Sequence, residues 1–233
     1  MLKASRAENP VVLSYLALRK AVGFIALGLP FALAIPWWFV WDHHILQSSI
    51  SAYYYTGMRN LFVGSLCAIS MFMLCCRGYD LKDEITGMFS SLCALGVAFF
   101  PTTPDFCATK HQHDIGTIHY IFAALLFSTL AYFCLFLFTM SAEGKKVTRK
   151  KLQRNWVYIV CGRVIIACIL LIVISKVPRV QRLFGNSEPV FWLETTALFA
   201  FGIAWLTKGE TFLKDEDGEA STTITSDGQV LKA

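Results

Sequence analysis

The sequence predicts an all-α membrane protein, a polytopic bundle of about six transmembrane helices with both termini in the cytoplasm. Its 233 residues are 55% hydrophobic and only 16% charged, and their mean hydropathy is +0.53. A soluble domain carries more charge and less apolar surface. The apolar residues are also gathered into six separate runs, and most basic residues lie in the short segments between them. This pattern is typical of a multi-pass membrane protein.

The first apolar run covers residues 21–41, about 30 Å of helix at 1.5 Å per residue, which is enough to cross a bilayer. Trp37, Trp38 and Trp41 at its far end are typical of a membrane interface. The run is longer than the core of a signal peptide and lacks a small-residue cleavage site. We therefore expect a retained first span.

Five further spans are predicted near residues 60–77, 85–101, 117–140, 156–175 and 189–206. The apolar cores of the second and third, 61–76 and 85–100, are near the lower length limit for a crossing. We expect them to extend into flanking residues or the bilayer to thin around them. Residues 1–20 are predicted to form a cytoplasmic segment. Residues 207–233, first acidic and then rich in Ser and Thr, are predicted to form a disordered cytoplasmic tail.

The distribution of Lys and Arg predicts the orientation. With the N-terminus inside, the inner segments hold fifteen basic residues and the outer segments five. Basic residues favour the cytoplasmic side, so both termini are expected there. The net charge of +5 then reflects topology, and no nucleic-acid partner is expected. We expect a multi-pass protein of a bacterial inner membrane whose partner is membrane lipid, and we leave a homo-oligomer open.

Ionisable residues inside apolar runs are the strongest functional pointers, because burying a charge in hydrocarbon is costly. Glu194 lies about one turn into the sixth run from its outer end, and Arg163 about two turns into the fifth from its inner end. Each either faces a polar cavity or belongs to a structural pair, and Arg163 also has the option of extending to the inner interface. Both are candidate ligand-binding residues.

The loop after the first span is unusually rich in hydroxyls and aromatic rings. Ser51, Tyr53 and Arg59 are candidate ligand-binding residues within it, because a guanidinium with nearby hydroxyls suits a lipid phosphate. An interfacial aromatic belt next to a solvated loop explains the same composition equally well.

Histidines mark the second outer loop and the helix after it. His119 opens the fourth span at the depth expected for Glu194, to which it could bond, and is a further candidate ligand-binding residue. In the loop, His111 and His113 with Asp105 are weak candidates for a metal site, since no His-x-x-x-His pair accompanies them. We predict no bound metal and no cofactor.

The order of these features resembles the Frag1/DRAM/Sfk1 group of six-span membrane proteins and a related bacterial membrane family of unknown function. The shared elements are Ile50-Ser51 after the first span, His119 opening the fourth and Glu194 early in the last. The eukaryotic group tends to carry Asp after Ile-Ser, where this chain has Ala52. The resemblance covers most of residues 11–207 and implies lipid-related roles, often without catalysis.

No nucleophile elbow, phosphate-binding loop or dinucleotide fingerprint is present, so the catalytic residues, if any, are unknown. We favour a non-enzymatic protein that binds a lipid or amphiphile headgroup in a polar cavity of the outer leaflet. A metal-dependent hydrolase of a lipid amide or ester is an alternative, suggested by a distant likeness to ceramidase-like membrane hydrolases, although their paired-histidine final helix is missing. A small-solute or proton-coupled transporter that uses Arg163 and Glu194 is another.

Overall fold

The computed structural model describes residues 10–40, 46–75, 81–140, 148–184, 187–211, 223–224 and 230–231. Its regular structure is helical apart from one antiparallel pair of two-residue strands in the tail, β1 (Thr223–Ile224) and β2 (Val230–Leu231). The predicted all-α class is therefore confirmed for the part of the chain that the structure describes.

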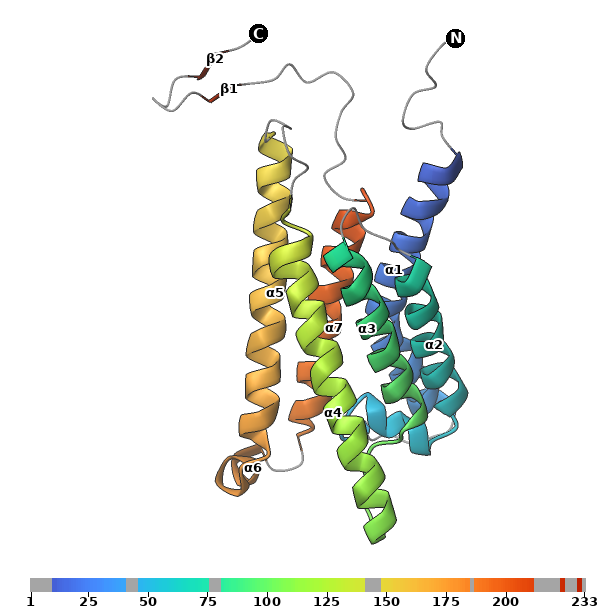
Figure 1. Cartoon of the computed structure of the whole chain (residues 1–233). Coiled ribbons are helices and arrows are strands. Elements are labelled where there is room, and N and C mark those ends of the chain that lie inside the picture. Colours follow the sequence, from blue (N-terminus) through green and yellow to red (C-terminus); the bar gives the residue numbers. More distant parts are fainter. Residues whose placement is uncertain are drawn as a thin grey trace.

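Long helices run side by side and form a bundle (Figure 1). They are α1 (Pro10–Phe39), α2 (Arg59–Cys75), α3 (Leu81–Phe99), α4 (Lys110–Tyr132), α5 (Arg149–Ser175) and α7 (Pro189–Lys208). Helix α4 continues into a π-helical turn, η3 (Phe133–Leu137). A short 3-10 helix, η2 (Ser51–Tyr55), precedes α2, and a short helix, α6 (Pro178–Phe184), lies between α5 and α7.

Four of the described helices are long and apolar enough to cross a membrane. They are α1 from Leu16 onward, α4 together with η3, α5 and α7. Helix α2 is also apolar but has only 17 residues. Helix α3 has 19 residues, and its first turn holds Lys82, Asp83 and Glu84. Both are longer than the 16-residue runs seen in the sequence, as expected from extension into flanking residues.

Several element boundaries differ from the prediction. Helix α1 begins at Pro10, so part of the predicted N-terminal segment is helical. Helix α4 begins at Lys110 rather than near 117, because a capping box between Thr109 and Gln112 satisfies its first free N–H groups. Helix α7 continues to Lys208. Apart from the short strand pair, the tail that was predicted to be disordered lies outside the described residues from 212 onward.

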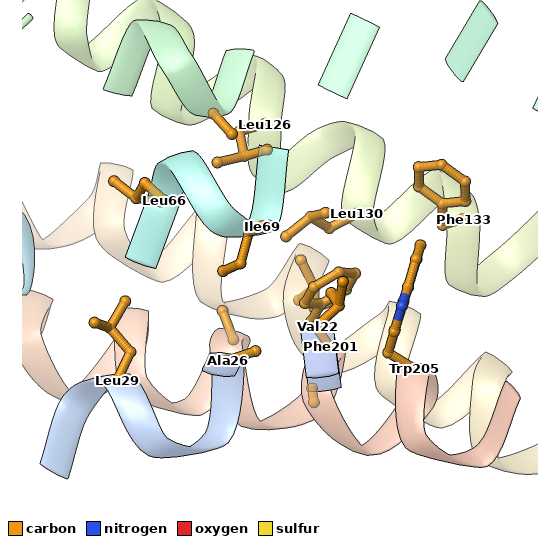
Figure 2. Close-up of a cluster of buried hydrophobic side chains, with 14 of the residues drawn as sticks. Val22, Ala26, Leu29, Leu66, Ile69, Leu126, Leu130, Phe133, Phe201 and Trp205 are labelled. Atoms are coloured by element: carbon orange, nitrogen blue, oxygen red, sulfur yellow. The ribbon is translucent and has the colours of Figure 1, made fainter. Parts of the chain in front are cut away.

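The hydrophobic core includes residues of all six long helices, and Figure 2 shows the part to which α1, α2, α4 and α7 contribute. The labelled side chains are Val22, Ala26 and Leu29 of α1, Leu66 and Ile69 of α2, Leu126 and Leu130 of α4, Phe133 of η3, and Phe201 and Trp205 of α7. Helices α1 and α7 approach closely because Gly202 lacks a side chain: a Cβ there would lie 3.0 Å from the Gly23 carbonyl oxygen. Small residues let membrane helices pack in this way.

The beginning of α1 and the end of α7 lie at the same end of the bundle (Figure 1). The Arg19 guanidinium donates to the carbonyl of Lys208 there, at 3.5 Å. Helix α6 and the loop that contains η2 lie at the other end (Figure 1). The described chain thus enters and leaves the bundle on one side.

Candidate functional site

A cavity of about 680 Å3 lies at the end of the bundle that holds α6 and η2. Its wall combines the middle of α4 and the first turns of α7 with the last turns of α5 and with the segments before η2 and α4. The polar lining residues are Ser48, Ser49, Ser51, Thr102, Thr103, Asp105, His119, Tyr120, Ser175, Lys176, Gln181, Ser187, Glu188 and Glu194. The volume is typical of cavities that bind small molecules.

Glu194 holds the loop before η2 against α7. Its Oε2 accepts the backbone N–H of Ile50 at 2.7 Å. Ile50 is the residue that begins the 3-10 turn, and no side chain of the turn itself caps it. The glutamate therefore caps η2 from a helix 144 residues away in sequence. Glu194 remains only partly buried and lines the cavity.

Local side-chain bonds also shape this loop. The Ser49 hydroxyl accepts from the N–H of Ala52 at 3.0 Å, and Thr56 donates to the Tyr53 carbonyl at 2.7 Å while accepting from Met58. Ser and Thr favour such tight turns because their hydroxyls bond to nearby backbone groups. The serines of this loop thus fold into a compact turn, and Ser51 is buried there, which does not fit the alternative of a solvated loop.

His119 fixes the end of α3 against α4. Its Nδ1 lies 2.7 Å from the carbonyl oxygen of Phe100, and the side chain is 2% exposed. The Val97 carbonyl would normally accept from the N–H of residue 101, but residue 101 is a proline and has no N–H. This carbonyl lies beside the imidazole of His119 as well. The histidine therefore satisfies carbonyl groups that the proline leaves free, while its ring lines the cavity.

Hydrogen bonds join the two loops at this end of the bundle. The Ser48 hydroxyl bonds to Asp105 Oδ1 at 3.0 Å, and the Tyr55 hydroxyl donates to the Thr102 carbonyl at 2.7 Å. The Thr102 hydroxyl in turn bonds to that of Tyr120 on α4 at 3.2 Å. Hydrogen bonds therefore tie the two loops to each other and to Tyr120 in the middle of α4, and these groups form a polar rim.

Charged side chains of opposite sign line the cavity. Lys176 ends α5, Asp105 lies before α4, and Glu188 immediately precedes α7. Burial raises the pKa of the Glu188 carboxyl, nearby Asp105 raises it further, and Lys176 lowers it in part. These three residues were not combined by the sequence analysis, since only the fold brings the three segments together.

Apolar residues continue the cavity into the bundle. They extend to Phe127 on α4 and Ile169 on α5, and Val190 adds to the wall from α7. From His119 to Phe127 this amounts to about 12 Å along the helix. Two further lining residues are also exposed on the outer surface: Tyr120 is 49% and Val173 65% exposed. The cavity wall therefore reaches the face of the bundle between α4 and α5.

The predicted ligand-binding residues divide into two groups. Ser51, His119 and Glu194 line the same cavity. The sequence left open whether His119 bonds to Glu194. In the described residues each side chain bonds to a backbone group instead. Tyr53 is fully buried next to the cavity between Trp37 and Phe191, with ring centroids 6.4 and 6.2 Å away, and does not line it.

Two predicted residues lie outside the cavity. Arg59 is exposed, and its Nε donates to the Tyr54 carbonyl at 2.8 Å while the guanidinium stacks on the Tyr54 ring. Arg163 is exposed on α5. It is six residues before Ile169, which places it about 120° around the helix from that lining residue. Neither guanidinium faces Glu194.

The weak metal-site candidates are dispersed. His111 and His113 are exposed on the first turn of α4, and two residues apart on a helix they point in nearly opposite directions. Asp105 bonds to Ser48 instead. Within the described residues, no group of three or more His, Cys, Asp and Glu side chains is placed to hold a metal ion.

The chain matches no known protein-family model and shows no significant similarity to a curated protein or to a solved structure. The resemblance to the Frag1/DRAM/Sfk1 group therefore stays a prediction. The site is defined by its own geometry: a polar rim around charged side chains, with an apolar wall that continues into the bundle.

Proposed function

We propose that this chain is a six-span membrane protein that binds the headgroup of a lipid or similar amphiphile in the cavity between α4, α5 and α7. The observation that carries the proposal is the composition of that cavity. Polar and charged groups such as Asp105, Lys176 and Glu188 surround one part, and an apolar wall ending at Phe127 and Ile169 forms the other. An amphiphile divides its surface in the same way.

The position of the cavity favours a membrane ligand over a water-soluble one. Its apolar wall includes Val173, which is 65% exposed on the outer face of α5. An acyl chain lying against that face has a continuous apolar path to the cavity, while the headgroup meets the polar rim. A site for a fully polar solute would be lined by hydrogen-bonding groups throughout.

The six-span topology rests on two further observations. Helices α2 and α3 lie side by side with the four longer helices (Figure 1). At 1.5 Å per residue, 17 and 19 residues extend about 26 and 28 Å, close to the thickness of the hydrocarbon core. An even number of crossings also agrees with the shared side of Arg19 and Lys208. With the positive-inside rule, that side is cytoplasmic and the cavity lies in the outer leaflet of a bacterial inner membrane.

Two native cysteines test this topology. Cys75 is exposed at the end of α2, and Cys107 is exposed in the loop before α4. Variants that retain only one of them should react with a membrane-impermeant maleimide from opposite sides: Cys107 in intact cells, and Cys75 only in inverted vesicles. Labelling of both from the same side would exclude a crossing by α3.

A cavity-filling variant tests lipid binding. Ala123 lines the cavity, so Ala123→Phe places a ring inside it. Leu125→Phe is the matched control, because Leu125 is 39% exposed on the same helix and does not line the cavity. Native mass spectrometry should show loss of co-purified lipid for Ala123→Phe alone. Equal lipid content in both variants and the wild type, at similar melting temperature, would contradict the proposal.

A further inference from the structure

The end of the bundle at which α1 begins and α7 ends gathers basic side chains. The Arg19 guanidinium of α1 donates to the carbonyl oxygen of Lys208, the last residue of α7, at 3.5 Å. A Cβ at the next residue, Gly209, would lie 3.2 Å from Cγ of Lys20, so the side chain of Lys20 also packs against the end of α7. Two basic residues of α1 therefore lie beside the helix end that carries Lys208.

Phe138, which follows η3, brings a cation of α5 to the same place. The Lys208 ammonium lies over the Phe138 ring, with Nζ 5.4 Å from the ring centroid. The carbonyl oxygen of Phe138 accepts from Nζ of Lys151 at 3.1 Å, and this ammonium also donates to the carbonyl of Met140 at 2.9 Å. The ring and the carbonyl of one residue thus each hold an ammonium, although the two lysines come from different helices.

The Lys208 ammonium has no direct acidic partner among the described residues. The side chain is only partly exposed, and its Nζ makes no hydrogen bond or ion pair within the described chain. The charges that act on it most strongly are those of Arg19, Lys151 and Arg154, all positive, and of one carboxylate, Asp83. A partly buried ammonium is usually paired. Its surroundings here favour an anion that the described residues do not supply.

We propose that this basic cluster, formed by Arg19, Lys20, Lys151 and Lys208, binds the phosphate of an anionic phospholipid. The cluster is a second lipid site, because the cavity lies at the opposite end of the bundle (Figure 1). Guanidinium and ammonium groups bind phosphate oxygens through charge-assisted hydrogen bonds, and basic pockets between transmembrane helices suit anionic headgroups. A zwitterionic lipid fits less well, because the same cations repel its positive group. With the proposed topology, the site faces the cytoplasmic leaflet.

Two lipids that share the phosphodiester and the acyl chains test this site. The purified protein is incubated with equal amounts of dioleoyl phosphatidylglycerol and dioleoyl phosphatidylcholine, and the bound lipids are counted by native mass spectrometry. We expect the glycerol lipid to bind about tenfold more tightly, a ratio within reach of one charge-assisted hydrogen bond. Salt should weaken the preference, because it screens partly exposed charges. Ala123→Phe, which fills the cavity, should retain the preference, so the two lipid sites are tested separately.

Variants locate the effect. Lys208→Gln removes the unpaired ammonium and should abolish the preference, whereas Lys208→Arg keeps the charge and should retain it. Arg149→Gln is the matched control, because Arg149 is exposed in the first turn of α5 and its loss removes one positive charge from the same end of the bundle. It should leave the preference unchanged. In lipid-free detergent, Lys208→Gln should melt at the wild-type temperature or above it, since repulsion from the other cations is relieved; a clear decrease would assign Lys208 a structural role and overturn the proposal.

The remaining outcomes exclude other anions. Equal binding of the two lipids to the wild type, or an equal loss of preference in Lys208→Gln and Arg149→Gln, overturns the proposal. Inorganic phosphate should not displace phosphatidylglycerol at equal concentration, and displacement would assign the cluster to a soluble phosphate. Residues 215–219 include four acidic side chains. A variant with Asn or Gln at these four positions should keep the wild-type preference; a preference that appears only in this variant would assign the cluster to the chain's own acidic segment.

Discussion

The bond between the Ile50 N–H and Glu194 can be tested directly by substitution. Ile50 is 4% exposed, and its N–H donates to Glu194 of α7 at 2.7 Å, while Ser49 accepts from the N–H of Ala52 in the same turn. Replacing Glu194 with alanine removes the acceptor and leaves a buried N–H without a partner. The loop that supplies Ser48, Ser49 and Ser51 to the cavity then loses its attachment to α7.

The size of the effect follows from this geometry. A buried donor left unpaired costs about 1–3 kcal/mol. For a chain of this length, each kcal/mol corresponds to about 2–4 °C in melting temperature, so Glu194→Ala should melt about 2–12 °C below the wild type. Glu194→Gln keeps an acceptor oxygen in the same place and loses only the charge. The difference between charged and neutral hydrogen bonds, about 1 kcal/mol, sets its shift at about 2–4 °C.

The assay is thermal unfolding of both variants in one detergent, together with hydrogen exchange of residues 46–58. Glu194→Ala should exchange faster in that loop, whereas Glu194→Gln should resemble the wild type. If the glutamine variant is as unstable as the alanine variant, the charge and not the accepted hydrogen bond holds the loop, and the capping role is refuted. Unchanged melting of Glu194→Ala would refute it as well.

Three other predictions concern single contacts and can be checked by the same unfolding measurement. A Cβ at Gly116 would lie 2.7 Å from the backbone nitrogen of Thr103, so Gly116→Ala should lower the free energy of unfolding by about 1–3 kcal/mol. Gly64→Ala is the control, because a Cβ at Gly64 would meet no atom within 4 Å. It should leave the free energy of unfolding unchanged or raise it by up to about 1 kcal/mol. Among the described residues the buried Tyr53 hydroxyl makes no hydrogen bond, so Tyr53→Phe should leave the melting temperature unchanged or higher. A clear decrease would show that the hydroxyl is bonded. The pKa of Glu188 is raised in the folded state, so stability should be full below its ordinary pKa of 4.5 and decrease as the pH rises through the raised pKa. Glu188→Gln should flatten that pH dependence, and an equal slope in the variant would assign it to another group.

The helices could be predicted from the sequence because apolar runs of sufficient length have few alternatives in a membrane protein. Their ends were harder to place. The start of α4 depends on Thr109 and Gln112, a capping pair with the Thr-x-x-Gln spacing that lies outside the apolar run. Hydropathy does not register such a pair, so His111 and His113 were assigned to a loop although both are helical.

The candidate site could be predicted only in part. His119 and Glu194 were identified because each is polar and lies at a similar depth near the outer end of an apolar run, and Ser51 because its loop is rich in hydroxyls. Depth follows from position in the sequence, whereas the direction in which a helical side chain points depends on how the helices pack. Arg163 therefore drew attention as an intramembrane charge, although it is exposed and does not line the cavity. Lys176 and Glu188 lie in connecting segments and gave no comparable signal.

The structural role of Glu194 and its place in the cavity are linked. Polar loops above a membrane bundle have their own backbone groups to satisfy, and Glu194 satisfies one of them with Oε2. The same carboxyl group lines the cavity that the loop helps to enclose. A ligand that donates to the other oxygen of Glu194, Oε1, would leave the bond from Ile50 to Oε2 in place and would hold the carboxyl group in this position. Binding and loop position would then be thermodynamically coupled, so a lipid that fills the cavity should slow hydrogen exchange at Ile50 in the wild type and much less in Glu194→Ala.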